Sequence, residues 1–250
     1  YLGPDQPATG FVCYTLCEQG KLEASIADIS ARYADHILRR SAGQPVVFLG
    51  WSWGGLLAYE TARLLAGKVD VRLIGMVDVC DMDTDFALGA IPSFAPGERD
   101  ATHARVQDWL GKTRMRAEWE TLLGSMDALA YEQFLSFVLN SEYDLPLDGP
   151  AVGSTEHIFW VLIDNALVFR QHQLLPHDVP IQSFAAEDTL HRGLNLIDWR
   201  QHSRLTQPAE IIAGTTHLHI IGMTAFHSRF ARRIDDVVAE LSLARRDAAE

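Results

Sequence analysis

Apolar residues recur along the chain with two periods, and these periods predict most of its secondary structure. At helical spacing they occupy one face of the segments 22–40 and 226–241, where charged residues separate them. The apolar segment 56–65 also has helical propensity. Short apolar runs predict strands instead. These runs lie at 11–14, 46–49, 73–77, 181–184 and 210–213.

The order of these elements predicts an α/β fold with a mostly parallel sheet. Strand, helix and strand follow one another through residues 46–77 with short connections, which is the arrangement of βαβ units. We expect 1–84 and 177–250 to form an α/β core that is interrupted by a helical insertion at 85–176. The helical segments predicted within the insertion are 102–124, 128–140 and 155–175.

Composition and charge exclude several classes of protein. The chain of 250 residues is 48% hydrophobic and 22% charged, which suits a large folded core rather than a disordered segment. No window approaches the apolar length of a membrane span. The formal net charge of −12 argues against nucleic-acid binding, which needs a basic surface. Three cysteines give no disulfide framework and no signal-peptide pattern is present, so we expect a cytoplasmic protein.

The motif that indicates chemistry is the segment 50–54, Gly-Trp-Ser-Trp-Gly, which fits G-x-S-x-G between a predicted strand and a predicted helix. In this context Ser52 lies on a strained turn that exposes its hydroxyl as a nucleophile. Gly50 and Gly54 lack a Cβ, which lets the strand and the helix approach each other. The backbone N–H of Trp53, next to the nucleophile, is the expected donor to an oxyanion.

A serine nucleophile needs a base, and the chain order Ser, acid, His places that base after the last strand. His217 ends the segment Gly-Thr-Thr-His that follows the predicted strand 210–213. His219, two residues further on, is the alternative. The two histidines alone are a weak indication of a metal, so no metal site is expected.

The base in turn needs a carboxylate that fixes its tautomer. Asp78 follows the strand 73–77, and Asp188 follows the strand 181–184 with Glu187 beside it. Both would lie at the carboxyl edge of the sheet, where sites in α/β proteins are found. Spacing alone does not choose between them.

The segment 50–60, the strand that ends at Val77-Asp78, and Gly214-Thr-Thr-His217 together resemble the thioesterase domains of nonribosomal peptide and polyketide synthetases. The resemblance covers nearly the whole chain and implies an α/β-hydrolase fold with a helical lid. It implies Asp78 rather than Asp188 as the acid. These domains also begin with a further strand and a loop that supplies a second oxyanion donor. No such stretch precedes Tyr1 in this sequence, so that donor is not named.

The resemblance implies that the chain releases an acyl or peptidyl group from the phosphopantetheine thiol of a carrier protein. Ser52 would form an acyl-enzyme that is resolved by hydrolysis or by cyclisation. No tightly bound cofactor is implied, and the carrier would be an adjacent domain of a synthetase. The alternatives are a stand-alone editing thioesterase, a small-molecule carboxylesterase without a carrier, and a non-catalytic binding scaffold.

Other residues have weaker assignments. The substrate pocket is predicted to include Trp51, Cys80 and His219. Three tryptophans of the insertion either line an acyl channel or pack its helices together: Trp109, Trp119 and Trp160. A docking surface for an acidic carrier would be basic, although an ordinary solvated face is the favoured interpretation of each basic cluster, because charged helix surfaces are the norm. The clusters are Arg39 and Arg40; Lys112, Arg114 and Arg116; and Arg229, Arg232 and Arg233.

Overall fold

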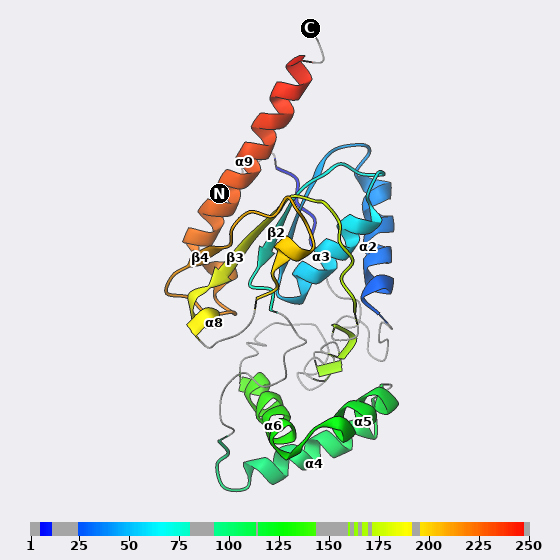
Figure 1. The fold of residues 1–250 in the computed structure, drawn as a ribbon, viewed down its shortest axis with the longest axis vertical. Helices are drawn as coiled ribbons and strands as arrows, with labels where there is room; N and C mark the ends of the chain where they lie inside the picture. Colours follow the sequence, from blue (N-terminus) through cyan, green and yellow to red (C-terminus); the bar gives the residue numbers. More distant parts are fainter. Residues whose placement is uncertain are drawn as a thin grey trace.

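A four-stranded parallel sheet in the order β1-β2-β3-β4 organises the protein (Figure 1). Its strands are β1 (Val46–Trp51), β2 (Val71–Val77), β3 (Ile181–Ala186) and β4 (Glu210–Ile212). The computed structural model describes residues 6–11, 25–80, 93–113, 115–143, 160, 163–164, 167–169, 172–191 and 196–247.

These strands confirm the four that the sequence predicts between residues 46 and 213, with small differences at their ends. The predicted strand at 11–14 lies outside the described residues except for Phe11, which is in no strand.

The register of β1 and β2 brings their carboxyl ends level, since Trp51 pairs with Val77. The ladder continues one residue past each strand. The Ser52 N–H donates to the Val77 carbonyl at 2.8 Å, and the Asp78 N–H donates to Phe184 at 2.7 Å. The residues that follow these two strands are thus held beside each other by backbone hydrogen bonds.

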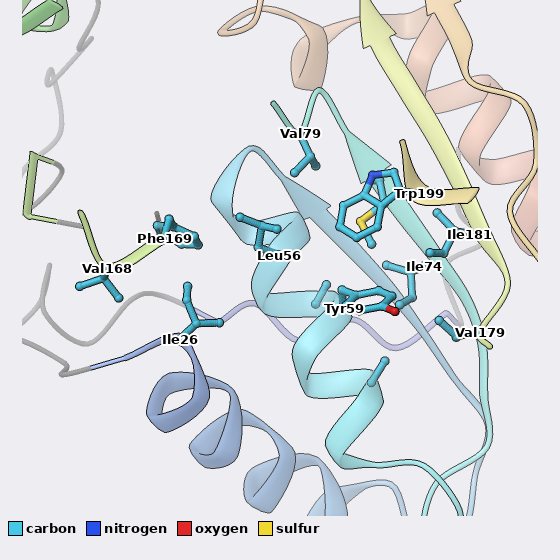
Figure 2. Packing of buried hydrophobic residues seen from close by; sticks show 13 residues of the cluster. Ile26, Leu56, Tyr59, Ile74, Val79, Val168, Phe169, Val179, Ile181 and Trp199 are labelled. Atoms are coloured by element: carbon cyan, nitrogen blue, oxygen red, sulfur yellow. The ribbon is translucent and has the colours of Figure 1, made fainter. Parts of the chain in front are cut away.

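Helices cover both faces of the sheet (Figure 1). On one face lie α2 (Ile26–Arg40) and α3 (Trp53–Leu64). Ile74 points to this face and joins the cluster around Leu56 and Tyr59, which Figure 2 shows from close by. The alternation of side chains along a strand sends its neighbours to the other face.

On that other face lies α9 (Thr224–Asp247), whose C-terminal half extends beyond the sheet (Figure 1). Leu73 and Val77 pack there with Phe226 and Phe230 of α9. A Cβ on Gly75 would lie 2.5 Å from the Phe230 ring, so this glycine makes room for the helix. The helix predicted at 226–241 is confirmed and is longer at both ends.

Between β2 and β3 the described chain forms a separate group of helices beyond one end of the sheet (Figure 1). Its members are α4 (Glu98–Leu110), α5 (Arg116–Ser125) and α6 (Ala128–Tyr143). They enclose an apolar cluster of their own that includes Trp119, Phe134 and Val138. No helix in the described ranges has the length and apolarity that crossing a bilayer requires.

One predicted helix of this group is wrong, because the segment 102–124 is broken into α4 and α5. The break begins at Gly111, the residue that caps the end of α4, and Thr113 lies two residues further on. The Thr113 hydroxyl accepts a hydrogen bond from the Met115 N–H at 3.2 Å and lies 3.0 Å from both carboxylate oxygens of Asp164. Most of the predicted helix 155–175 lies outside the described residues.

The three tryptophans of the insertion meet in the helical group. Trp109 stacks on Trp160 with ring centroids 4.8 Å apart, and its edge meets Trp119 at 5.1 Å. Trp109 and Trp119 are buried. Their contacts match the packing alternative, in which they join the helices together.

The chain returns from the helical group to the core through contacts with α3. Val168 and Phe169 pack into the cluster of Figure 2 beside Leu56. The Tyr59 hydroxyl lies 3.0 Å from the Leu175 carbonyl oxygen. Buried Glu60 pairs with Arg63 and lies 3.6 Å from His172. The returning segment is therefore fixed against the helix that begins at Ser52.

Asp164 is a buried carboxyl in the core of the helical group, where it accepts a hydrogen bond from Trp119 Nε1 at 2.9 Å. Burial raises its pKa to about 6, against the smaller opposite effect of the hydrogen bonds from Trp119 and Thr113. A carboxyl whose pKa is raised on folding favours the folded state when protonated, and this contribution is lost as pH rises through the raised pKa.

We therefore expect Asp164→Asn to raise the melting temperature at pH 8 and to have little effect near pH 4. At 1.36 kcal/mol per pH unit, the raised pKa corresponds to roughly 3 kcal/mol at pH 8. Thermal unfolding followed by circular dichroism across this pH range measures the difference. Asp100→Asn is the control, since the Asp100 side chain is 86% exposed. A variant that melts below the wild type at every pH would contradict the prediction.

Candidate active site

Ser52 lies on a sharp turn between β1, which ends at Trp51, and α3, which begins at Trp53. Its backbone has φ 52° and ψ −128°, a conformation that residues with a Cβ seldom adopt. The Gly55 N–H donates to the Ser52 carbonyl at 2.9 Å, and the Ser52 N–H is bonded to β2. Surrounding structure thus imposes the strained backbone, as at many functional sites.

Two glycines allow this turn to close. A Cβ on Gly50 would lie 2.2 Å from the Gly54 carbonyl oxygen, and one on Gly55 would lie 2.4 Å from Val79 Cγ2. A Cβ on Gly54 would meet no atom within 4 Å. The prediction that Gly54 provides the close approach is therefore wrong; Gly55, the next residue, provides it together with Gly50.

His217 brings the loop after β4 to Ser52. Its Nε2 lies 3.1 Å from Ser52 Oγ, and its Nδ1 lies 2.8 Å from Asp78 Oδ2. The three side chains therefore form one hydrogen-bonded series from hydroxyl to imidazole to carboxylate. The His217 side chain is 31% exposed, whereas that of Asp78 is fully buried.

Asp78 is held by more than His217. Its Oδ1 accepts from the Ala186 N–H at 2.8 Å, and its Oδ2 also accepts from the Thr189 hydroxyl at 2.6 Å. Like Ser52, it has a positive φ, here 51°. Hydrogen bonds to a buried carboxylate compensate for its loss of water and fix the direction of its oxygens.

The alternative acid and the alternative base have other contacts. Asp188, in α8 (Glu187–His191), uses its backbone N–H to bind the Thr215 carbonyl at 3.2 Å. His219 Nδ1 lies 2.8 Å from the Thr216 hydroxyl. The carboxylate that meets His217 Nδ1 is that of Asp78, and the imidazole that meets Ser52 is that of His217.

The loop that carries His217 is attached at three points. Glu187 Oε2 accepts from the Gly214 N–H at 2.9 Å, and the Asp188 N–H reaches Thr215. Trp51 Nε1 donates to the carbonyl oxygen of His217 itself at 2.9 Å. Both α8 and β1 thus orient the imidazole.

Three further residues follow the ends of β1, β2 and β4 in the chain: Trp53, Cys80 and His219. Trp53 stacks on Phe169 with ring centroids 4.6 Å apart, so the chain returning from the helical group covers the first residue of α3. Cys80 pairs with Leu196 in an isolated β-bridge just past Asp78. His219 lies at the start of a short 3-10 helix beyond His217.

The arrangement suits nucleophilic chemistry at a serine hydroxyl. His217 Nε2 can take the Ser52 proton, and Asp78 can stabilise the resulting imidazolium through Nδ1. The N-terminus of α3 presents backbone N–H groups and a partial positive charge beside Ser52, which favours a developing oxyanion. Within the described ranges, no group of three or more His, Cys, Asp or Glu side chains could hold a metal ion.

Comparison with known proteins agrees with the resemblance seen in the sequence. Residues 4–84 match the family model of the thioesterase domain. Within this thioesterase segment lie the Ser52 turn and Asp78, whereas His217 lies outside it. Orsellinic acid synthase armB of Armillaria mellea is 34% identical over 74 residues, which cover 30% of this chain and 3% of that synthase.

Two solved structures establish the fold. A four-domain nonribosomal peptide synthetase has a TM-score of 0.53 and 20% identity, over 89% of this chain and 16% of that one. The NocB thioesterase domain from the nocardicin cluster has a TM-score of 0.50 and 16% identity, over 89% of this chain and 77% of that one. With the parallel sheet and its flanking helices, they confirm the predicted α/β-hydrolase fold.

Sequence reasoning missed the groups that hold Asp78 and the loop of His217. Thr189 lies in a short helix after β3, and the Ala186 N–H belongs to the backbone, so neither has a motif. The direction of the Trp51 side chain was missed as well. A buried aspartate at the end of a parallel strand does require partners, and the end of the adjacent strand is the place to look for them.

The two glycines of the turn give a matched test of its geometry. Gly50→Ala forces a Cβ against the backbone of Gly54 and Gly55, and we expect a loss of about 3 kcal/mol or more in the free energy of unfolding. Gly54→Ala, in the first turn of α3 with open space around it, should be neutral or stabilising. Denaturant unfolding of both variants measures the difference. If both variants were equally stable, the turn would not require a residue without a Cβ at position 50.

Proposed function

We propose that this chain is a serine thioesterase that releases an acyl or peptidyl group from a carrier-protein thioester. The observation that carries the proposal is the series from Ser52 Oγ through His217 to buried Asp78, set on a strained turn at the N-terminus of α3. The thioesterase match over residues 4–84 supports the type of bond that is attacked.

In the first half of the proposed reaction, His217 takes the proton of the Ser52 hydroxyl as the oxygen attacks the thioester carbonyl. The Trp53 N–H stabilises the oxyanion of the tetrahedral intermediate. The intermediate collapses, the carbon–sulfur bond breaks, and the imidazolium returns the proton to the leaving thiolate. An acyl group remains on Ser52 as an oxygen ester.

In the second half, His217 removes a proton from the incoming nucleophile as it attacks the ester carbonyl. The bond between the acyl carbon and Ser52 Oγ then breaks, and the imidazolium returns the proton to Ser52 Oγ. Water gives a free acid, whereas an amine or hydroxyl of the acyl chain gives a ring. A lid formed by the helical group would select between them by admitting or excluding water. The Trp53–Phe169 stack supports this role, because it connects the chain from that group with the turn at Ser52.

The proposed partner is the phosphopantetheine arm of an acyl or peptidyl carrier domain in the same synthetase. A synthase and a multidomain synthetase among the similar proteins support this proposal. The basic clusters are largely paired with acidic neighbours: Arg39 with Asp35, Lys112 with Asp108, Arg116 with Glu120, Arg229 with Glu210, and Arg233 with Asp236. These pairs give none of the clusters an advantage as the docking surface; Arg114 lies outside the described residues.

The first test is acylation of Ser52. We expect an acyl-pantetheine thioester to add one acyl group to the wild type, seen by intact-protein mass spectrometry, and to add none to Ser52→Ala. Ser242→Ala is the control, since Ser242 is exposed on α9, where its hydroxyl donates to the Val238 carbonyl of the same helix. The released product distinguishes hydrolysis from cyclisation. Turnover of a plain ester with no gain from the pantetheine arm would favour a carboxylesterase instead.

The same assay also tests a stand-alone editing role, which would favour short acyl groups on the carrier over a full-length chain. A binding scaffold without catalysis would leave both the thioester and a fluorophosphonate probe unreacted.

A second test concerns the acid. Asp78→Asn should lower kcat by about 10,000-fold, because His217 would then be held in the wrong tautomer and its imidazolium left without a counter-charge. Asp188→Asn should keep nearly full activity, since the carboxylate that meets His217 Nδ1 is that of Asp78. Steady-state kinetics on a thioester compares the two variants after circular dichroism shows that each is folded. The reverse order of activity would make Asp188 the acid.

A further inference from the structure

Trp51 precedes Ser52 in the chain, but its side chain is directed at His217. The indole Nε1–H donates to the carbonyl oxygen of His217 at 2.9 Å. The indole and imidazole rings are also in contact, with centroids 5.2 Å apart and planes inclined by 32°. One side chain therefore contacts both the backbone and the ring of the proposed base.

The base belongs to a part of the chain that lacks regular structure. His217 follows β4, whose three residues end at Ile212, and precedes a short 3-10 helix. The contacts from α8 hold Gly214 and Thr215, before His217. The Trp51 indole, in contrast, bonds to the backbone of His217 itself, whose ring meets Ser52 and Asp78.

Trp51 itself is rigidly placed. It is the last residue of β1 and pairs with Val77, the last residue of β2. Ser52 follows Trp51 directly, and Asp78 follows Val77. Its side chain packs against the apolar cluster between the sheet and α9, next to Val77 and Phe184. Trp51 thus connects His217 to the ends of β1 and β2, which Ser52 and Asp78 follow.

We propose that Trp51 is a positioning residue that holds His217 in line between Ser52 and Asp78. Its indole also stabilises the imidazolium that forms in each half of the reaction. An aromatic face attracts a cation within about 6 Å, and the two rings lie inside that distance. This inference rests on the proposed function, and it replaces the assignment of Trp51 to the substrate pocket.

Two substitutions separate the contacts. Trp51→Phe keeps an aromatic ring and removes the N–H donor, whereas Trp51→Leu removes both. A catalytic group displaced by about 1 Å can lower the rate roughly 100-fold. We therefore expect Trp51→Phe to lower kcat for a thioester about 10- to 100-fold with KM unchanged. Trp51→Leu should be slower still, because it also leaves the imidazolium without the ring.

Active-site titration with a fluorophosphonate distinguishes positioning from loss of structure. Its end point counts the competent sites and its rate reports how reactive each site is. We expect full labelling of Trp51→Phe at a lower rate per site. A lower end point with an unchanged rate would assign Trp51 a purely structural role and overturn the inference.

A spectroscopic readout does not depend on turnover. We expect a proton between His217 Nδ1 and Asp78, which lie 2.8 Å apart, to give a downfield NMR signal in the free protein, and we expect Trp51→Phe to shift or broaden it. Trp53→Phe is the matched control. It changes a tryptophan on the other side of Ser52 that contacts Phe169, so that signal should stay in place.

The outcomes separate the two proposals. A raised KM with an unchanged labelling rate and NMR signal would return Trp51 to the substrate pocket. A wild type that neither labels nor forms an acyl adduct would contradict the proposed function, whatever the Trp51 variants do to the signal. A wild type that reacts while Trp51→Phe matches it in rate and signal contradicts only the inference.

Discussion

The parallel register of β1 and β2 is the constraint on which the site depends. Because Trp51 pairs with Val77, the residues that follow, Ser52 and Asp78, leave the sheet side by side at its carboxyl edge. Both have a positive φ, so both strands turn sharply at the same level. A slip of one residue would reverse the faces of a strand and separate the two groups. The apolar alternation that buries Ile74 and Val77 on opposite faces therefore also sets the distance from nucleophile to acid.

The third group reaches the site without help from the ladder. His217 lies on a loop after a strand of three residues. One backbone hydrogen bond, from Asp188 to Thr215, holds this loop, and the other contacts come from side chains: Asp78 at the His217 ring, Trp51 at its carbonyl, and Glu187 at Gly214. These interactions come from three different strand ends. The geometry of the base is thus a property of the assembled sheet edge and not of its own segment.

Much of the fold and of the site could be predicted from the sequence, because these parts depend on local patterns. The buried strands, the G-x-S-x-G turn and the aspartate after β2 each have a signal within a few residues. The contact of Thr113, just past the break at Gly111, with Asp164 has no local signal, because the two residues lie far apart in the chain. The role of Gly55 was assigned to Gly54 because spacing does not tell which glycine faces Val79. Partners such as Thr189 exist only once the sheet has formed.

The two tryptophans beside Ser52 show how a strand-to-helix turn divides its neighbours. Alternation along β1 and the turn at Ser52 send Trp51 toward His217, and the start of α3 sends Trp53 toward Phe169. Of these two tryptophans, Trp51 thereby faces the loop of His217, and Trp53 faces the chain that returns from the helical group. If that group acts as a lid, its movements reach the turn through Trp53 and Phe169. Trp51 packs instead against the cluster between the sheet and α9, so it connects His217 to the sheet and not to the helical group.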